Sequence, residues 1–227
     1  MHTSRLTFSA LLITLALSTS GCIIHVGGHN NDSDKSSVFG GFDISKNSQI
    51  GDISSVNGGI VLQDGVTAED VSTVNGSIEI GKNVKLIEAS TVNGDIEAKN
   101  NLKVENYLGT INGSITLQNG SQVGSHLSNV NGEIVLTGTT IGGDIETING
   151  DITLSHNSII EGDILFDSNN DSGWWGKHDG NNSHTPTLTI DASSTVKGKI
   201  VLERKVVLEI ANSELLEKIE RHYKTEQ

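Results

Sequence analysis

Apolar and polar positions repeat along most of this chain in a unit of 18 or 19 residues. Each unit carries an Asn-Gly pair, whose asparagines are Asn57, Asn75, Asn93, Asn112, Asn131 and Asn149. Three positions after each asparagine there is always an isoleucine, namely Ile60, Ile78, Ile96, Ile115, Ile134 and Ile152. Two positions further lies a second aliphatic file, formed by Leu62, Ile80, Ala98, Leu117, Leu136 and Leu154. A third apolar file directly precedes the asparagines and consists of Val56, Val74, Val92, Ile111, Val130 and Ile148. Alternation with a period of two, rich in β-branched residues, predicts short strands.

One unit of this length cannot fold alone. It buries about five aliphatic side chains, worth about 1.5–3 kcal/mol each, whereas ordering each residue costs about 1–2 kcal/mol of backbone entropy. Units must therefore stack, so that each strand pairs with its equivalent in the next unit and the apolar files form one core. We expect an all-β fold: a single-stranded, three-sided parallel β-helix of about eight to nine turns over residues 38–210, right-handed by preference, with a left-handed coil as the alternative.

Two polar files accompany the apolar ones. Asparagine and glycine tolerate left-handed backbone conformations at corners between strands, and stacked asparagines can hydrogen-bond along the axis. The six Asn-Gly asparagines are therefore interpreted as a structural corner ladder, with a binding surface as the alternative. A Gly-Asp-Ile motif recurs at Asp52, Asp95, Asp144, Asp151 and Asp163. Each aspartate precedes an inward isoleucine, which predicts outward, solvated carboxylates that also discourage sideways association.

The first 37 residues have a different composition. Residues 1–21 carry Arg5, an apolar run over residues 6–17 and then small residues, which is typical of an export signal and too short for a membrane span of about 20 residues. The single cysteine, Cys22, follows directly. This arrangement resembles a bacterial lipoprotein signal, which implies an acylated Cys22 as the first mature residue. The alternative is an ordinary secretory signal that ends near a cysteine. Ile23 in the following position favours the outer membrane by the same resemblance. Residues 22–37 are expected to form a flexible tether.

The repeat is interrupted once near its end. Gly162 and Gly198 are 36 residues apart, the length of two turns, and we interpret residues 167–185 as a loop extruded from the stack. This loop contains Trp174, Trp175, Lys177 and His178, and exposed aromatic side chains on a polar loop are typical of recognition sites. The alternative is that the tryptophans cover a groove in the wall of the helix.

The last segment, residues 211–227, is expected to cap the stack. Asn212 or Ser213 can cap a helix that runs from Glu214 to Arg221, and such a helix would cover the exposed strand edges. The alternative is one more degraded turn over residues 206–216 followed by a charged tail.

The composition argues against several classes of function and of binding site. Lys and Arg number 15 against 28 Asp and Glu, so the formal net charge is −13 and nucleic-acid binding is disfavoured. One cysteine allows neither an internal disulfide nor a thiolate zinc site. We expect no catalytic residues, no metal and no cofactor. His178, Asp179 and His184 have ligand side chains but no metal-binding spacing, and no P-loop, nucleophile elbow or HExxH motif occurs.

The serial VNGSI and INGDI turns, with the closing stretch TPTLTIDASSTVKGKIVLERKVVLEI, resemble bacterial envelope proteins with an adhesin-like, DUF4097-type β-helix, and more distantly the polymer-forming bactofilins. The resemblance implies no reaction. The sequence thus predicts a non-catalytic envelope lipoprotein, anchored to the membrane through lipid, whose rigid acidic scaffold presents the Trp-containing loop to a protein or glycan. The alternatives are a self-assembling filament subunit and, less favoured, a polysaccharide-active or acyltransferase enzyme.

Overall fold

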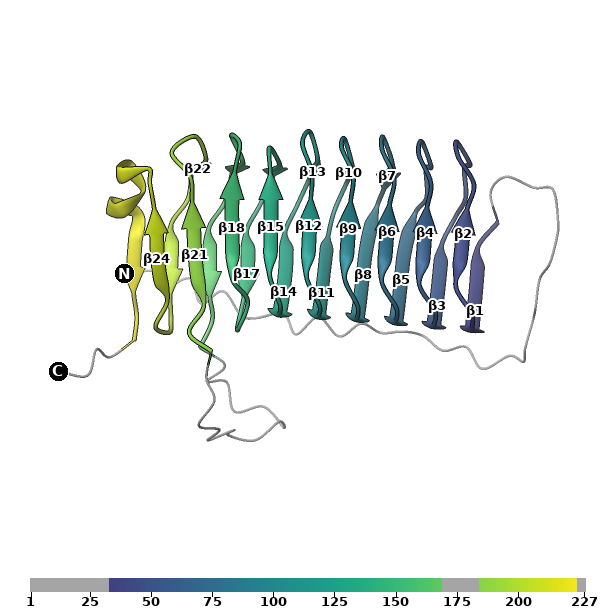
Figure 1. Cartoon of the computed structure of the whole chain (residues 1–227), viewed down its shortest axis with the longest axis horizontal. Helices are drawn as coiled ribbons and strands as arrows, with labels where there is room; N and C mark the ends of the chain where they lie inside the picture. The colour runs from purple at the N-terminus through teal and green to yellow at the C-terminus, as the bar shows by residue number, and fades with distance from the viewer. Residues whose placement is uncertain (1–32, 169–183, 224–227) are drawn as a thin grey trace, which may run out of the picture.

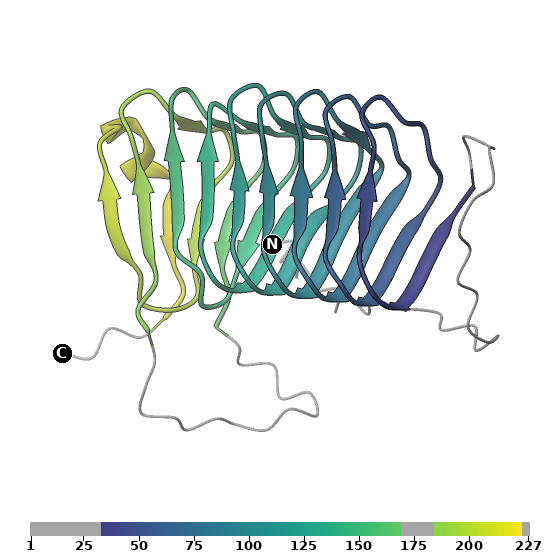
Figure 2. The same ribbon diagram turned by 45° about the vertical axis from the view of Figure 1, so that its right-hand side comes forward.

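The computed structural model describes residues 33–168 and 184–223 and shows a β-solenoid of about nine turns (Figure 1). Consecutive strands of the chain belong to different sheets, and every strand pairs in parallel with its equivalent in the next coil. Three sheets therefore run along the rod and enclose one core (Figure 2). This confirms the predicted all-β, three-sided parallel β-helix.

The strands are short, and each sheet contributes one side of the solenoid. Sheet A contains, in order, β1 (Lys35–Phe39), β3 (Ile53–Asn57), β5 (Asp70–Asn75), β8 (Glu88–Asn93), β11 (Leu108–Asn112), β14 (Leu127–Asn131), β17 (Ile145–Thr147), β20 (Ile164–Phe166), β23 (Ile200–Leu202) and β25 (Ile219–Arg221). Sheet B contains β2 (Phe42–Ile44), β4 (Ile60–Leu62), β6 (Ile78–Ile80), β9 (Ile96–Ala98), β12 (Ile115–Leu117), β15 (Ile134–Thr137), β18 (Ile152–Ser155), β21 (Thr187–Ile190) and β24 (Val207–Ile210). Sheet C contains β7 (Lys85–Leu86), β10 (Lys103–Val104), β13 (Gln122–Val123), β16 (Thr140–Ile141), β19 (Ile159–Ile160) and β22 (Thr195–Val196).

The isoleucine file predicted from the repeat lies at the centre of the core. All six isoleucines are completely buried, and the aliphatic residues two positions further on are at most 3% exposed. The register aligns each isoleucine with the next, for example Ile96 with Ile115 and Ile115 with Ile134. The hydrophobic effect on this file holds the coils together, because no single coil has a core of its own.

The predicted place of the third apolar file in the core is wrong. The residues before the Asn-Gly asparagines are half-buried on the outer face of sheet A, with the exception of the buried Ile148. The inward position is one residue earlier and is polar: Ser55, Thr73, Thr91, Thr110, Asn129 and Thr147 are at most 3% exposed. The reason is that side chains alternate strictly between the two faces of a strand. Each of these strands has a buried aliphatic residue near its start, such as Ile53 or Leu108, and the residue two positions later therefore also faces the core.

Five of the six buried polar side chains donate a hydrogen bond to the preceding coil, whereas Thr147 accepts one from the amide of Gly150 over 3.0 Å and Oδ1 of Asn129 is buried without a partner among the described residues. The hydroxyl groups of Ser55, Thr73, Thr91 and Thr110 donate to the carbonyl oxygens of Gly40, Gly58, Gly76 and Gly94 over 2.9–3.1 Å. Asn129 donates to Gly113 in the same way, over 3.1 Å. A buried hydroxyl without a partner would be costly, so these four hydroxyl groups also fix the corner of the coil before them.

The conformational reason given for the Asn-Gly corners is also wrong. Of the glycines that follow the six asparagines, only Gly132 has a positive φ, of 127°. The left-handed residues form a separate file between sheets B and C, which contains Asn47, Gly65, Asn83, Asn101, Gly120, Gly138 and His156. Glycine is required after each asparagine because of close stacking. A Cβ atom on Gly113 would lie 2.0 Å from the carbonyl oxygen of Gly94.

The two ends of the solenoid differ from the sequence-based boundaries. β1 begins at Lys35, so residues 35–37 belong to sheet A rather than to a tether. At the other end a 3₁₀ helix, η1 (Ser213–Lys218), is capped by the side chain of Asn212 and is followed by β25. The predicted helix to Arg221 is therefore wrong in its second half, because Ile219 aligns with Ile200 of β23 and the chain gains strand hydrogen bonds there.

Candidate functional site

The Trp-containing segment lies where one coil is longer than all others. β20 pairs with β23 and β18 pairs with β21 in a step of 36 residues, for example Ile152 with Leu188. The amide of Gly198 donates to the carbonyl of Gly162 over 3.0 Å, so the two glycines lie in adjacent coils. This coil is therefore about twice as long as the others, and its additional residues come between β20 and β21 in the chain.

The predicted recognition residues Trp174, Trp175, Lys177 and His178 fall outside the described residues, as does Cys22. Of the loop, the structure describes the departing end at Asp167 and Ser168 and the returning end from His184 onward. The candidate site is thus defined here by its base, which consists of these two ends and the coil wall that holds them.

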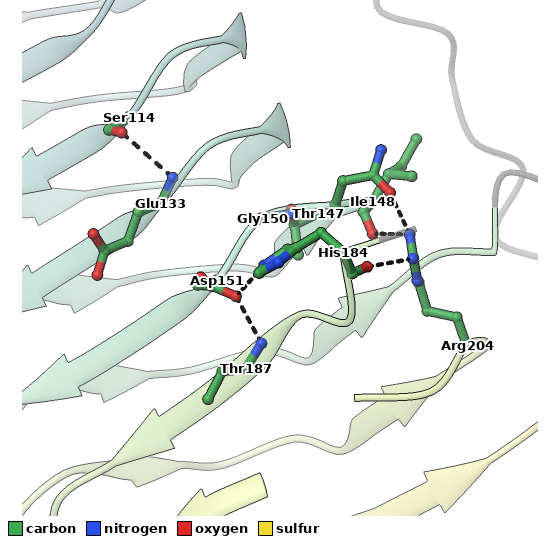
Figure 3. A network of polar contacts seen from close by, with 10 residues as sticks. Ser114, Glu133, Thr147, Ile148, Gly150, Asp151, His184, Thr187 and Arg204 are labelled. Atoms are coloured by element: carbon green, nitrogen blue, oxygen red, sulfur yellow. Dashed lines mark hydrogen bonds and ion pairs between the residues drawn. The ribbon is translucent and has the colours of Figure 1, made fainter. Parts of the chain in front are cut away.

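Asp151 holds the returning end of the loop. Its Oδ1 atom accepts a hydrogen bond from the backbone amide of Thr187 over 2.7 Å and lies 2.9 Å from Nε2 of His184 (Figure 3). The contact with His184 becomes an ion pair when the imidazole is protonated. One carboxylate therefore fixes both the backbone of β21 and the side chain that leads into it.

Arg204 joins the same end to the wall of sheet A. Its Nη1 atom donates to the carbonyl of Ile148 over 2.8 Å and to Oδ1 of Asn149, while Nη2 donates to the carbonyl of His184 over 3.1 Å (Figure 3). A planar guanidinium with several donors suits such a junction. Partial burial lowers the pKa of the Arg204 side chain from its ordinary value.

Arg204 also ends the asparagine ladder. Along the rod, Nδ2 of each asparagine donates to Oδ1 of the one before, with distances of 2.8–3.0 Å from Asn75 to Asn149. At the first end, Asn57 donates to the carbonyl of Val38 over 3.2 Å. In the coil after Asn149 the equivalent position is Ser168, and the guanidinium of Arg204, one coil further, donates to the Oδ1 of Asn149.

The departing end of the loop is acidic. Glu146 on β17 lies near Asp144, Asp167 and Glu203. Burial, followed by the charges of Asp167, Asp144 and Glu203, raises the pKa of Glu146 to about 7. Burial and the neighbouring Asp167 carboxylate likewise raise the pKa of Glu203. Ser168 donates to Glu203 over 3.4 Å. Negative charge thus gathers at the point where the chain leaves the solenoid, whereas a cation marks its return.

The aspartates of the Gly-Asp-Ile motifs act on the backbone. Their carboxylates accept hydrogen bonds from amides of the next coil: Asp52 from Asp70, Asp95 from Ser114, Asp144 from Asp163 and Asp163 from Lys199, over 2.7–3.2 Å. The glycine before the donor amide of the next coil provides the room, since a Cβ atom on Gly162 would lie 2.1 Å from Oδ1 of Asp144. These carboxylates are exposed or half-buried, and they also serve as caps between coils.

Sheet B carries a shallow groove of about 380 Å³ on its outer face. Lys46, Gln63, Asp64, Glu79, Glu97 and Lys99 contribute to its walls. Three of these side chains are already engaged across coils, because Gln63 donates to Asp43 over 2.8 Å and Lys46 lies 3.6 Å from Asp64. The groove is open, and no aromatic side chain lines it.

His126 and His156, two histidines on the solenoid, have local structural contacts or conformations. His126 packs against Tyr107 with ring centroids 5.5 Å apart, and its Nδ1 lies 2.8 Å from the hydroxyl of Ser125. His156 occupies the left-handed corner file. Across residues 33–168 and 184–223, no three His, Cys, Asp or Glu side chains are grouped so that they could hold a metal ion.

Sequence reasoning missed the two residues that hold the base of the loop. Asp151 was identified only as a member of the Gly-Asp-Ile file, and Arg204 was not singled out. The sequence did contain a signal for the role of Asp151, because its Gly-Asp-Ile motif is the last one but one before the repeat is interrupted. Arg204 offered none, because its partners Ile148 and Asn149 are 56 and 55 residues away in sequence.

Comparison with known proteins identifies no relative of this chain: no family model, curated protein or solved structure matches it. Within the part of the chain that the structure describes, no helix is both long and apolar enough to cross a membrane.

Proposed function

We propose that this protein is a non-catalytic lipoprotein of the cell envelope, whose rigid acidic β-helix presents the loop of residues 167–185 to a protein or glycan partner. The observation that carries the proposal is the anchored base of that loop. Arg204 and Asp151 bind its returning end to the wall of the solenoid. A recognition segment held at its base loses less freedom on binding than one on a mobile tether.

The rest of the solenoid supports a scaffold role. The asparagine ladder, the threonine file and the Gly-Asp-Ile carboxylates all make contacts between coils. These contacts and the continuous isoleucine core resist bending and local opening. Side chains that an enzyme would direct at a substrate are used here to join one coil to the next.

Anchoring through Cys22 rests on the sequence of residues 1–23. Several acyl chains, at about 0.8 kcal/mol per buried CH₂ group, would hold the protein stably in a bilayer, with the outer membrane favoured by Ile23. We expect Cys22→Ser to abolish incorporation of radiolabelled palmitate and to move the protein from the membrane fraction to the soluble fraction. Ser37→Ala is the control and should leave both unchanged. Membrane retention of the unlabelled variant would contradict lipid anchoring.

The recognition role is tested with Trp174→Ala combined with Trp175→Ala. In a glycan array and a pull-down from envelope extracts, we expect the full chain to retain a partner that the double variant loses, at an unchanged melting temperature. Phe39→Ala is the matched control, because Phe39 is an aromatic residue with 83% exposure on the solenoid itself. A clear fall in the melting temperature of the double variant would show instead that the tryptophans cover the wall.

The filament alternative is less well supported. Stacking of solenoids end to end needs free strand edges on all three sides. At the C-terminal end η1 lies where a further strand would pair with β22, and Asn212 and Lys218 donate to carbonyl oxygens there.

A further inference from the structure

The chain contains seven Asn-Gly pairs, six in the asparagine ladder and one at Asn119–Gly120. In such a pair the backbone nitrogen of the glycine can reach the side-chain amide carbon of the asparagine, because glycine has no Cβ atom to hinder the approach. This reaction releases ammonia and requires a glycine amide that is free to lose its proton. A hydrogen bond from that amide to an oxygen atom therefore protects the pair.

Six of the seven glycine amides are protected in this way. The amide of Gly120 donates to the carbonyl of Gly138 over 2.9 Å, and the amide of Gly150 donates to Oγ1 of Thr147 over 3.0 Å. Four further amides donate to the carbonyl of the ladder asparagine in the next coil, each over 3.0 Å, namely those of Gly58, Gly76, Gly94 and Gly113. The reaction in these six pairs first has to break a hydrogen bond.

Gly132 is the exception. Its amide donates no hydrogen bond to any residue within 33–168 or 184–223, and among the ladder glycines it alone has a positive φ, of 127°. The cause lies in the next coil, where β17 ends at Thr147 and the chain turns tightly. The amide of Asn149 donates back to the carbonyl of Val130 over 2.8 Å. The carbonyl of Asn149 is therefore not the acceptor that its place in the ladder would make it.

The side chains of Asn131 and Asn112 are held alike. Each donates to the ladder member before it and accepts from the one after it, over 2.8–3.0 Å. Both asparagines are exposed, and the glycines that follow them are both half-buried. The ladder thus opposes the reaction equally in the two pairs, and the hydrogen bond of the glycine amide distinguishes them.

We propose that Asn131–Gly132 is the site at which this protein is modified by deamidation. The Gly132 amide gives its proton to hydroxide, and its nitrogen forms a bond to Cγ of Asn131. The bond from Cγ to Nδ2 breaks, and Nδ2 leaves as ammonia with a proton from water. Water then opens the cyclic imide. Attack at Cγ gives aspartate, whereas attack at the main-chain carbonyl carbon gives isoaspartate, so that an amide and a water become a carboxylate and an ammonium ion.

The modification weakens the corner beside the base of the loop. A carboxylate in place of the Asn131 amide cannot donate to Oδ1 of Asn112, so one ladder hydrogen bond is lost. Isoaspartate also lengthens the backbone where coils are in close contact, since a Cβ atom on Gly132 would lie 2.2 Å from a carbonyl oxygen of the preceding coil. The next ladder member is Asn149, to which Arg204 binds.

Peptide mapping by mass spectrometry of the full, folded chain in mildly alkaline buffer tests the assignment. We expect the mass change from amide to acid at Asn131 about tenfold or more faster than at Asn112, because the latter reaction has one more hydrogen bond to break. The chain unfolded in denaturant is the matched control, since both pairs lose their hydrogen bonds there and should react at similar rates. Equal rates in the folded chain, reaction at neither residue, or the same ratio of rates in both states overturns the proposal.

Two variants identify the source of the ammonia. Asn131→Gln should remove most of the ammonia that the folded chain releases, because the longer side chain cannot form the same ring. Asn75→Gln makes the same chemical change three ladder positions earlier and should leave the release unchanged, with circular dichroism as the measure of folding. Unchanged release from Asn131→Gln, or an equal loss in both variants, overturns the proposal. Neither experiment involves a partner or a membrane, so failure here is distinct from failure of the proposed function.

Discussion

The side-chain amine of Lys218 lies 2.6 Å from the carbonyl oxygen of Val196. One coil earlier, the equivalent carbonyl of Ile160 accepts from the backbone amide of Lys197 over 2.8 Å. Asn212 plays the same part at the neighbouring position, where its Nδ2 donates to the carbonyl of Ser194 over 3.2 Å. One coil earlier, the equivalent carbonyl of Ser158 accepts from the backbone amide of Thr195. Side chains thus replace the backbone donors that a further coil would supply to sheet C.

Removal of this cap should weaken the C-terminal end. We expect Asn212→Ala combined with Lys218→Met to lower the free energy of unfolding by about 1–3 kcal/mol, since one neutral and one charged donor are lost. Self-association that increases with concentration should appear in analytical ultracentrifugation, because carbonyl groups of β22 become available for pairing. Lys205→Met makes the same chemical change at an exposed lysine and should alter neither quantity. An unchanged stability and a strict monomer would contradict the capping role.

The central isoleucine file should dominate stability. Ile115 is completely buried between Ile96 and Ile134. We expect Ile115→Ala to cost about 2–5 kcal/mol in chemical unfolding, because it leaves a cavity in a core with no other layer. Thr116→Ala, one residue along the same strand but on the outer face, should cost much less. Equal effects of the two substitutions would contradict the assignment of the file to the core.

Substitutions in one Asn-Gly pair distinguish the contribution of side-chain hydrogen bonds from that of close backbone packing. Asn112→Ala removes two ladder hydrogen bonds, of 3.0 and 2.8 Å, and should cost about 1–2 kcal/mol. Gly113→Ala should cost more, because its Cβ atom would lie 2.0 Å from the carbonyl of Gly94 and the coils would have to separate. Thermal unfolding of both variants decides the order. A smaller effect at Gly113 than at Asn112 would contradict the steric role of the glycine.

Glu146 should make stability depend on pH. Burial and the neighbouring carboxylates raise its pKa from 4.5 to about 7 in the folded protein, so the folded state binds the proton more tightly than the unfolded state. The free energy of unfolding should then fall as the pH rises from about 4.5 to about 7. Glu146→Gln should remove this component and raise the melting temperature at pH 8 more than at pH 5. Glu79→Gln, at an exposed position on sheet B, is the control. An identical pH profile for Glu146→Gln and the unmodified protein would contradict the prediction.

The sequence by itself determined the repeat and most of its core. The isoleucines that follow the Asn-Gly pairs recur at a fixed spacing, and this spacing can only be satisfied by parallel, aligned strands in successive coils. It also located the interruption between Phe166 and Thr187. The prediction failed where either of two neighbouring residues could have faced the core, as at Thr73 and Val74. The threonine can be buried because its hydroxyl donates a hydrogen bond to a carbonyl of another coil, and the sequence does not show that carbonyl.

The tertiary structure decided the contacts that depend on stacking. Asn149 and Arg204 are 55 residues apart in sequence but only two coils apart along the axis, because one of these coils is 36 residues long, about twice the usual length. The left-handed corners, the amides that the Gly-Asp-Ile carboxylates cap and the role of Lys218 follow from the same cause. Each is set by what lies one coil away along the axis, which neither local propensity nor side-chain pattern specifies.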